Sequence, residues 1–198
     1  MRLDLVVGSN GAGKTTFVRK VLIRSLPPET AFVNADEIAA RRWPDDPEGR
    51  SYDAARIAAD TRQALLHDRR PFVAETVFSH PSKLDLVAAV RAAGFAVALH
   101  VILVPEDLTV ARVEHRVASG GHAVPEDKIR QRYRRLWTLV RQAIDATETA
   151  TVYDNSAHAG PWIVAQLVSG VPVGAVRWPL WSPPELATGW PSTPEYLA

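Results

Sequence analysis

The sequence predicts an α/β fold in which a five-stranded parallel sheet carries helices on both faces. Short apolar runs of strand length alternate with longer segments of helical periodicity, as expected for repeated strand–helix units. A glycine-rich loop at residues 8–13 also separates the first apolar run from the first helical segment. Polar side chains then follow several of the expected strands, at the edge where such sheets bind ligands.

Each element in the first half of the chain has its own signal. Residues 3–7 form a short apolar run that is typical of a buried parallel strand. Pro44, Pro47 and Gly49 indicate a loop at residues 41–50. The expected strands are 3–7, 31–34 and 71–76, and the expected helices are 17–23 and 51–68.

Glycine and proline mark the boundaries in the second half. Gly94 ends one helix, and Pro105 closes the long apolar strand that begins at residue 95. Pro125 suits the first turn of a long helix. The expected helices are 81–93, 106–118 and 125–147, and the expected strands are 95–104 and 149–153.

Composition limits the class of protein. The 198 residues suffice for one domain with a sizeable core, and the net charge of +1 makes nucleic acid an unlikely partner. Cysteine is absent, and the N-terminal apolar run is too short for a signal peptide or a membrane span. We therefore expect a cytoplasmic protein with no membrane partner.

The last residues differ from the rest. Residues 171–198 contain six prolines and three tryptophans, and this proline density is expected to exclude a helix. The sequence therefore predicts a kinase domain at residues 1–170 and a Pro/Trp-rich extension at 171–198. We expect the extension to pack on the domain, although it is also suited to hold a partner or ligand.

The glycine-rich loop matches the pattern G-x-x-x-x-G-K-[ST], which defines a P-loop. Its glycines let the backbone curl around phosphate oxygens, and the following helix points its positive end at the anion. Lys14 is expected to reach the β- and γ-phosphates of ATP, and the Thr15 hydroxyl is expected to ligate Mg²⁺. The nucleotide-binding residues predicted here are Gly8, Ser9, Asn10, Gly11, Ala12, Gly13, Lys14, Thr15 and Thr16. The expected fold is thus of the P-loop NTPase kinase type.

Two carboxylates follow the second and third strands. Asp36 suits a general base that takes the proton of an acceptor hydroxyl, unless it only caps the following helix. Glu75 suits a residue that holds the acceptor or orients Mg²⁺-bound water, unless it is a cap or part of a surface ion pair. Thr76 adds a hydroxyl that an acceptor can contact.

Arginine is concentrated late in the chain. Residues 112–141 hold eight basic and three acidic side chains, any of which can simply be solvated. Arg112 and Arg116 precede Gly120 and Gly121, so their helix can close over ATP as a lid, with His122 assisting. Asn155 follows the last strand and is predicted either to contact adenine or to cap a turn.

Together these motifs resemble the zeta-toxin family of P-loop kinases. The resemblance rests on the P-loop and on the segments Phe-Val-Asn-Ala-Asp-Glu (32–37), Glu-Thr (75–76), Gly-Gly-His-Ala-Val-Pro (120–125) and Val-Tyr-Asp-Asn-Ser (152–156). It implies a kinase that uses ATP and Mg²⁺ to phosphorylate a sugar hydroxyl of UDP-N-acetylglucosamine, and a protein antitoxin that blocks the nucleotide site.

The same resemblance assigns roles to residues. It implies that Lys14 and Thr15 bind ATP and Mg²⁺, that Asp36 is the base, and that Glu75 holds the substrate. It implies that Arg112 or Arg116 contacts phosphate. One departure is that His122 stands where the family carries a second lid arginine. Arg130 and Arg134 are the candidates to take the place of that arginine. Arg56 lies where the resemblance places a substrate arginine.

The leading interpretation is therefore a small-molecule kinase. One alternative is an ATP-hydrolysing switch or binding module, which would need no organic acceptor. Another is a nucleic-acid end kinase that uses the arginine-rich helix.

Overall fold

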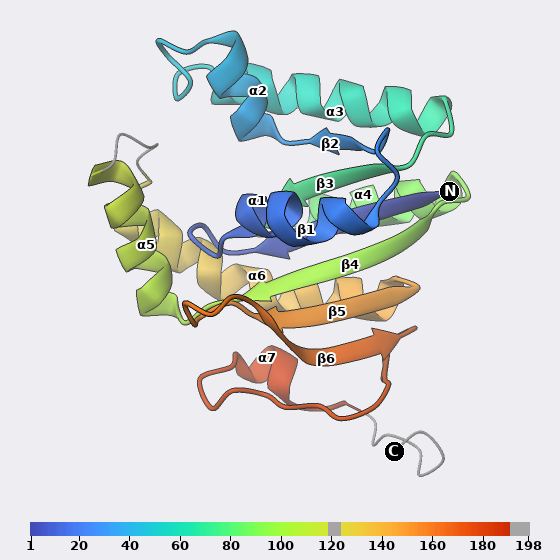
Figure 1. Cartoon of the computed structure of the whole chain (residues 1–198), viewed down its shortest axis with the longest axis vertical. Helices are drawn as coiled ribbons and strands as arrows, with labels where there is room; N and C mark the ends of the chain where they lie inside the picture. Colours follow the sequence, from blue (N-terminus) through green and yellow to red (C-terminus); the bar gives the residue numbers. More distant parts are fainter. Residues whose placement is uncertain (119–123, 191–198) are drawn as a thin grey trace.

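The computed structural model describes residues 1–118 and 124–190, and it confirms the α/β fold. Within these residues the sheet has seven strands in the order β2-β3-β1-β4-β5-β6-β7 (Figure 1). The first five pair in parallel, and the last two add antiparallel pairs to one edge. The strands are β1 (Arg2–Gly8), β2 (Ala31–Val33), β3 (Phe72–Thr76), β4 (Ala96–Leu103), β5 (Thr149–Asp154), β6 (Trp162–Val168) and β7 (Val171–Pro172).

The sequence predicts five strands, and the antiparallel strands β6 and β7 bring the sheet to seven among the described residues. β6 contains one extra residue opposite the step from Val152 to Tyr153, so its buried and exposed side chains do not alternate regularly. A bulge of this kind hides the period of two by which a half-buried strand is recognised.

The predicted helices appear at the predicted places, with small differences at their ends. The helix α2, which follows Asn34, reaches Arg42 and so shortens the expected loop at 41–50. The four-residue helix α7 corrects the expectation that the prolines after residue 170 exclude a helix, because its two prolines lie at the N-cap and in the first turn, where no helical N–H is required. The helix after the P-loop begins as α1 (Lys14–Phe17) and continues through a π-helical turn and a 3₁₀ turn to Ser25. The others are α2 (Ala35–Arg42), α3 (Ser51–His67), α4 (Ser82–Ala92), α5 (Glu106–Ala118), α6 (Glu126–Ala146) and α7 (Pro184–Ala187).

Helices cover both faces of the sheet. Leu3, Leu5 and Val7 of β1 belong to a large core that includes side chains of α3, α4 and α6. Val6 lies in a smaller core with Phe17 on the opposite face. In Figure 1, α1 accordingly lies in front of the sheet while α4 and α6 lie behind it. The central strands are therefore buried on both faces, which explains their continuous apolar runs.

The C-terminal segment runs along β6 and then over the large core. The backbone N–H of Arg177 donates to the carbonyl of Val164 at 2.9 Å. Trp178, Trp181 and Trp190 are partly buried against the core, and the Arg141 guanidinium lies 3.5 Å from the centre of the Trp190 ring. A boundary at residue 170 remains a prediction. No helix in the described ranges combines the length and apolarity needed to cross a membrane.

Trp137 is expected to be essential for stability. It lies on α6, is 2% exposed, and is among the largest fully buried side chains. Trp137→Ala removes its packing and leaves a cavity, which should lower the free energy of unfolding by about 3–5 kcal/mol in urea denaturation. Tyr52→Ala is the control, because Tyr52 is 91% exposed and its loss should change stability by less than about 0.5 kcal/mol. Equal effects of the two substitutions would contradict this core assignment.

Candidate active site

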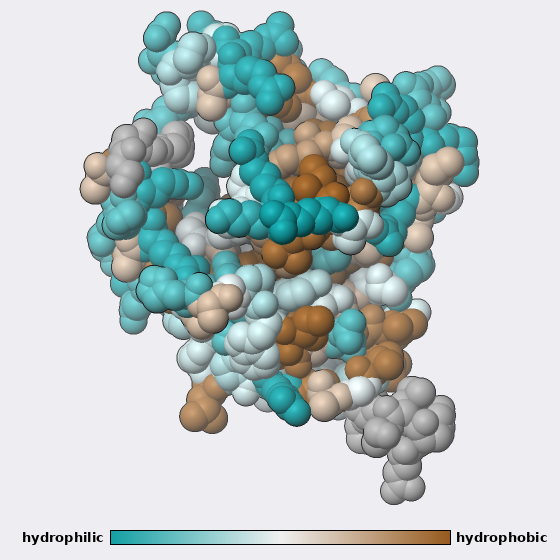
Figure 2. Space-filling view, in the orientation of Figure 1, coloured by the Kyte–Doolittle hydropathy of each residue, from teal (hydrophilic) through white to brown (hydrophobic). Residues whose placement is uncertain are grey.

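A cavity of about 620 Å³ lies at the carboxyl ends of β1 and β3. Its walls come from the P-loop, the start of α2, the segment after β3, and the helices α5 and α6. Figure 2 shows this region as a hollow flanked by hydrophilic residues, between the parts that Figure 1 labels α2 and α5. The predicted site residues that line the cavity are Asn10, Gly11, Gly13, Lys14, Thr15, Thr16, Asp36, Glu75, Thr76, Arg112 and Arg116.

The P-loop needs its glycines because other groups approach it closely. A Cβ on Gly11, where φ is 73°, would lie 2.6 Å from the carbonyl oxygen of Thr109. A Cβ on Gly13, where φ is 86°, would lie 2.7 Å from Nδ2 of Asn155. Both positions thus exclude a side chain on backbone and steric grounds.

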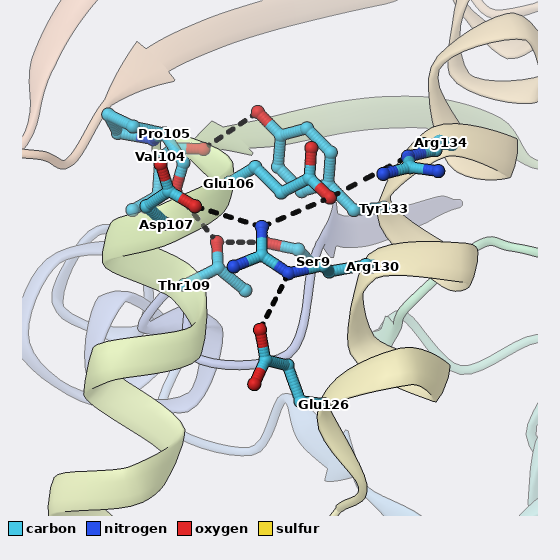
Figure 3. Close-up of polar contacts among 10 residues, drawn as sticks. All are labelled: Ser9, Val104, Pro105, Glu106, Asp107, Thr109, Glu126, Arg130, Tyr133 and Arg134. Carbon is cyan, nitrogen blue, oxygen red and sulfur yellow. Dashed lines mark hydrogen bonds and ion pairs between the residues drawn. The ribbon is translucent and has the colours of Figure 1, made fainter.

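Gly8, Ser9 and Ala12 of the P-loop are buried, and contacts from other segments hold the loop in place. The Asn155 amide donates to the carbonyl of Ala12 at 2.8 Å, so Asn155 holds the loop in place and does not line the cavity. The hydroxyls of Ser9 and Thr109 lie 3.1 Å apart, which links the loop to α5 (Figure 3). Gly8, Ser9 and Ala12 also lie outside the cavity wall and support its shape.

Lys14 is partly buried and lines the cavity. Its ammonium donates to the carbonyl of Ser9 at 2.9 Å. Burial lowers the pKa of Lys14, Arg116 lowers it further, and the carboxylates of Glu75 and Asp36 partly offset both effects. The four charged groups therefore act on one another in a shared space.

Thr15 and Glu75 form a direct contact. The Thr15 hydroxyl donates to Oε1 of Glu75 at 2.9 Å, which leaves the oxygen lone pairs of Thr15 available to a cation. Oε2 of Glu75 is buried and has no hydrogen-bond partner among the described residues. Burial raises the pKa of Glu75, while Lys14 and the bond from Thr15 lower it. A hydroxyl oxygen beside a carboxylate suits Mg²⁺, which usually binds phosphates and only one or two protein oxygens.

Asp36 does not cap its helix, contrary to the alternative reading of the sequence. The cap of α2 is Asn34, whose side-chain oxygen accepts from the backbone N–H groups of Asp36 and Glu37 at 2.8 and 3.3 Å. Glu37 points to Arg19 and forms an ion pair of 2.7 Å with it. The Asp36 carboxylate is thereby left at the cavity wall.

Arg130 and Arg134, the candidate substitutes for a second lid arginine, do not line the cavity. Arg130 contacts the carboxylates of Asp107 and Glu126 at 2.8 Å each, and Arg134 lies 3.7 Å from Glu106 (Figure 3). These ion pairs join the bases of α5 and α6, outside the cavity wall.

A different arginine of α6 lines the cavity. Arg132 lies on the opposite flank of the helix from Arg130 and joins Arg112 and Arg116 in the wall. Helical periodicity separates the two flanks but does not show which one faces the P-loop. Arg112 also donates to the carbonyl of Ser156 at 3.4 Å.

The structure does not bring every predicted residue to the cavity. Arg56 is exposed on α3, lies 3.7 Å from Asp53, and is outside the cavity wall. His122 lies outside the described residues. The wall instead includes Ser79 and His80, which lie in the stretch from 77 to 81 that has no regular period, and Lys83 of α4. The sequence predicts the helix that carries Lys83 but not which of its side chains meets the cavity.

Comparisons with known proteins place the chain in a family. A family model described as an AAA domain matches residues 3–147. An uncharacterised protein of Haemophilus influenzae is 30% identical over 129 residues, covering 64% of this chain and 88% of that protein.

Solved structures support the P-loop kinase-like fold. The AvrRxo1-ORF1:-ORF2 complex with ATP has a TM-score of 0.65 at 16% identity, over 85% of this chain. The match spans only 59% of the length of that chain. A structure of the PezAT toxin–antitoxin system of Streptococcus pneumoniae has a TM-score of 0.62 at 15% identity, covering 77% of this chain and 66% of that one.

The buried carboxyl of Glu75 predicts a specific pH dependence of stability. Its pKa is raised above the usual 4.5 in the folded protein, so the folded state holds this proton more tightly than the unfolded state. Stability is therefore lost as the pH rises from about 4.5 through the raised pKa. The free energy of unfolding of Glu75→Gln, measured relative to the unmodified protein, should increase across this window.

Urea denaturation at several pH values from 4.5 to 8 measures this difference. Glu29→Gln, at an exposed position, is the matched control and should give a difference that varies little with pH. If the free energy of unfolding of Glu75→Gln relative to the unmodified protein stayed flat or fell with pH, the raised pKa of Glu75 would be contradicted.

Proposed function

The chain belongs to the AAA-domain family, and on that premise we propose that it transfers the γ-phosphate of ATP to a hydroxyl of a small molecule. One observation carries the proposal. Lys14, Asp36 and the Thr15–Glu75 pair come from three separate segments and meet at one cavity of about 620 Å³. A phosphate cradle beside a carboxylate base is the arrangement that phosphoryl transfer to a hydroxyl requires.

The proposed reaction breaks the bond between the γ-phosphorus and the β–γ bridging oxygen of ATP. The acceptor oxygen forms the new bond to phosphorus, its proton passes to the carboxylate of Asp36, and ADP leaves. Asp36 has no capping role that would compete with this one, because Asn34 caps α2.

Three groups of residues support this step. Lys14 and the backbone of the P-loop are positioned to bind the β- and γ-phosphates. Thr15 and Glu75 would hold Mg²⁺, which when bound neutralises phosphate charge. Arg112, Arg116 and Arg132 bring three cations to the wall formed by α5 and α6, where they can stabilise the transferred group.

A sugar nucleotide is the acceptor that we propose to test first. The motif resemblance to zeta toxins favours UDP-N-acetylglucosamine, and the PezAT likeness, at 15% identity, shows the fold alone. A protein antitoxin is likewise a proposal from that resemblance. Nucleic acid is a weaker acceptor candidate, because Arg130 and Arg134 of the arginine-rich helix are in ion pairs.

The function is tested by incubating the protein with labelled ATP, Mg²⁺ and either UDP-N-acetylglucosamine or a metabolite extract. We expect one compound to gain the mass of one phosphate, and Lys14→Ala to abolish this product because it removes the phosphate-binding cation. Labelled inorganic phosphate alone, formed equally with and without extract, would favour the ATP-hydrolysing switch.

Asp36→Asn separates chemistry from nucleotide binding. Removal of the base should lower turnover by about 10²–10⁴ while ATP affinity stays within a few-fold. Steady-state kinetics and ATP titration measure the two quantities. Glu37→Gln is the neighbouring control, since Glu37 faces Arg19, and it should retain turnover. Near-normal turnover of Asp36→Asn would remove Asp36 from the mechanism.

A further inference from the structure

A second, smaller cavity of about 110 Å³ adjoins the candidate active site. The two cavities share Ala35, Ala55, Glu75, Thr76 and Lys83 in their walls. The smaller one lies among α3, α4 and the sheet, and no P-loop residue belongs to its wall. It therefore extends the side of the active site that faces away from the expected nucleotide.

Two cations project from the helices on either side of this small cavity. Arg62 comes from α3 and Lys83 from the first turn of α4, and both are half-buried. Burial lowers the pKa of each group, and the charge of Arg62 lowers the pKa of Lys83 further. Neither side chain forms an ion pair or hydrogen bond with any residue in 1–118 or 124–190. The rest of the wall is largely apolar.

This arrangement is costly to the protein alone. Two like charges in a partly apolar hollow repel each other, and each has lost part of its hydration. Among the described residues, Glu75 is the one carboxylate in this wall, and its Oε1 already accepts a hydrogen bond from Thr15. A bound anion would offset the unfavourable charge where the described part of the chain supplies no ion-pair partner.

We propose that Arg62 and Lys83 bind an anionic group, a phosphate or a carboxylate, of the phosphoryl acceptor. This inference rests on the proposed kinase function and narrows its acceptor to an anionic compound. The anion lies between α3 and α4, and the reacting hydroxyl lies in the larger cavity near Asp36. Glu75 lines both cavities, and its buried Oε2, which has no partner among the described residues, is suited to accept a hydrogen bond from a second hydroxyl of the acceptor. Neutral polyols are then poor substrates.

The test measures anion binding with the P-loop already filled. The whole chain is saturated with a non-hydrolysable ATP analogue and Mg²⁺ and titrated calorimetrically with inorganic phosphate and, separately, with malonate. We expect saturable binding of at least one anion, and the stronger of the two identifies the acceptor's group as phosphate or carboxylate. Arg62→Met and Lys83→Met should each weaken that binding about tenfold or more. Arg70→Met is the matched control because Arg70 is exposed and lies outside both cavity walls.

A second readout separates ligand binding from a structural role. Without anion, Arg62→Met and Lys83→Met should raise the melting temperature, because each removes one of two repelling charges. Anion should then raise it less than in the unmodified protein. Lower melting temperatures without anion, or equal anion affinity in Arg62→Met and the unmodified protein, would overturn the proposal.

Failure of the kinase proposal is visible separately. Loss of ATP-analogue binding in the unmodified protein would count against the kinase function. The anion titration would then be repeated in two variants that lack the P-loop lysine, Lys14→Ala and Lys14→Ala with Arg62→Met. An equal anion affinity of these two variants would still reject the proposed anion subsite. Normal analogue binding without any anion binding would reject the subsite alone.

Discussion

The parallel pairing of β1 with β3 is the constraint on which the site depends. Their register sets Val6 beside Glu75 and Val7 beside Thr76, immediately before the chain enters the P-loop. Backbone hydrogen bonds thus place Glu75 where the Thr15 hydroxyl, 60 residues earlier in the chain, can donate to it at 2.9 Å. Without this register the phosphate cradle and the acidic side chains would lie at different heights of the sheet.

A second set of contacts fixes the opposite wall. The ion pairs of Arg130 and Arg134 join the start of α5 to α6, and the Tyr133 hydroxyl donates to the carbonyl of Val104 at 3.0 Å (Figure 3). Carboxylates in the first turn of α5 also suit the positive end of that helix. The base of the helix pair is therefore held while its arginine-bearing faces are directed to the cavity.

Charge is concentrated in the cavity at a cost in stability. Lys14, Arg62 and Lys83 are half-buried, and Glu75 carries a buried oxygen that has no hydrogen-bond partner among the described residues. The large core beneath the sheet, which includes Trp137 and Leu136, supplies the apolar burial that offsets this cost. Charges that oppose folding and favour an anionic ligand are a common feature of binding sites.

The sequence by itself determined the five parallel strands, the P-loop and the positions of Asp36 and Glu75 at strand ends, because strand–helix alternation and the glycine spacing are local patterns. The tertiary structure alone decided that Asn34 caps α2, that Asn155 holds the loop, and that Arg132 rather than Arg130 or Arg134 faces the cavity. It also placed Arg62, about one and two-thirds turns beyond Arg56 on the same helix, in the wall of the adjoining cavity, while Arg56 lies outside both walls. The reason is physical: the period of a helix states which side chains share a face, but only packing against the sheet and its neighbours decides which face meets the ligand.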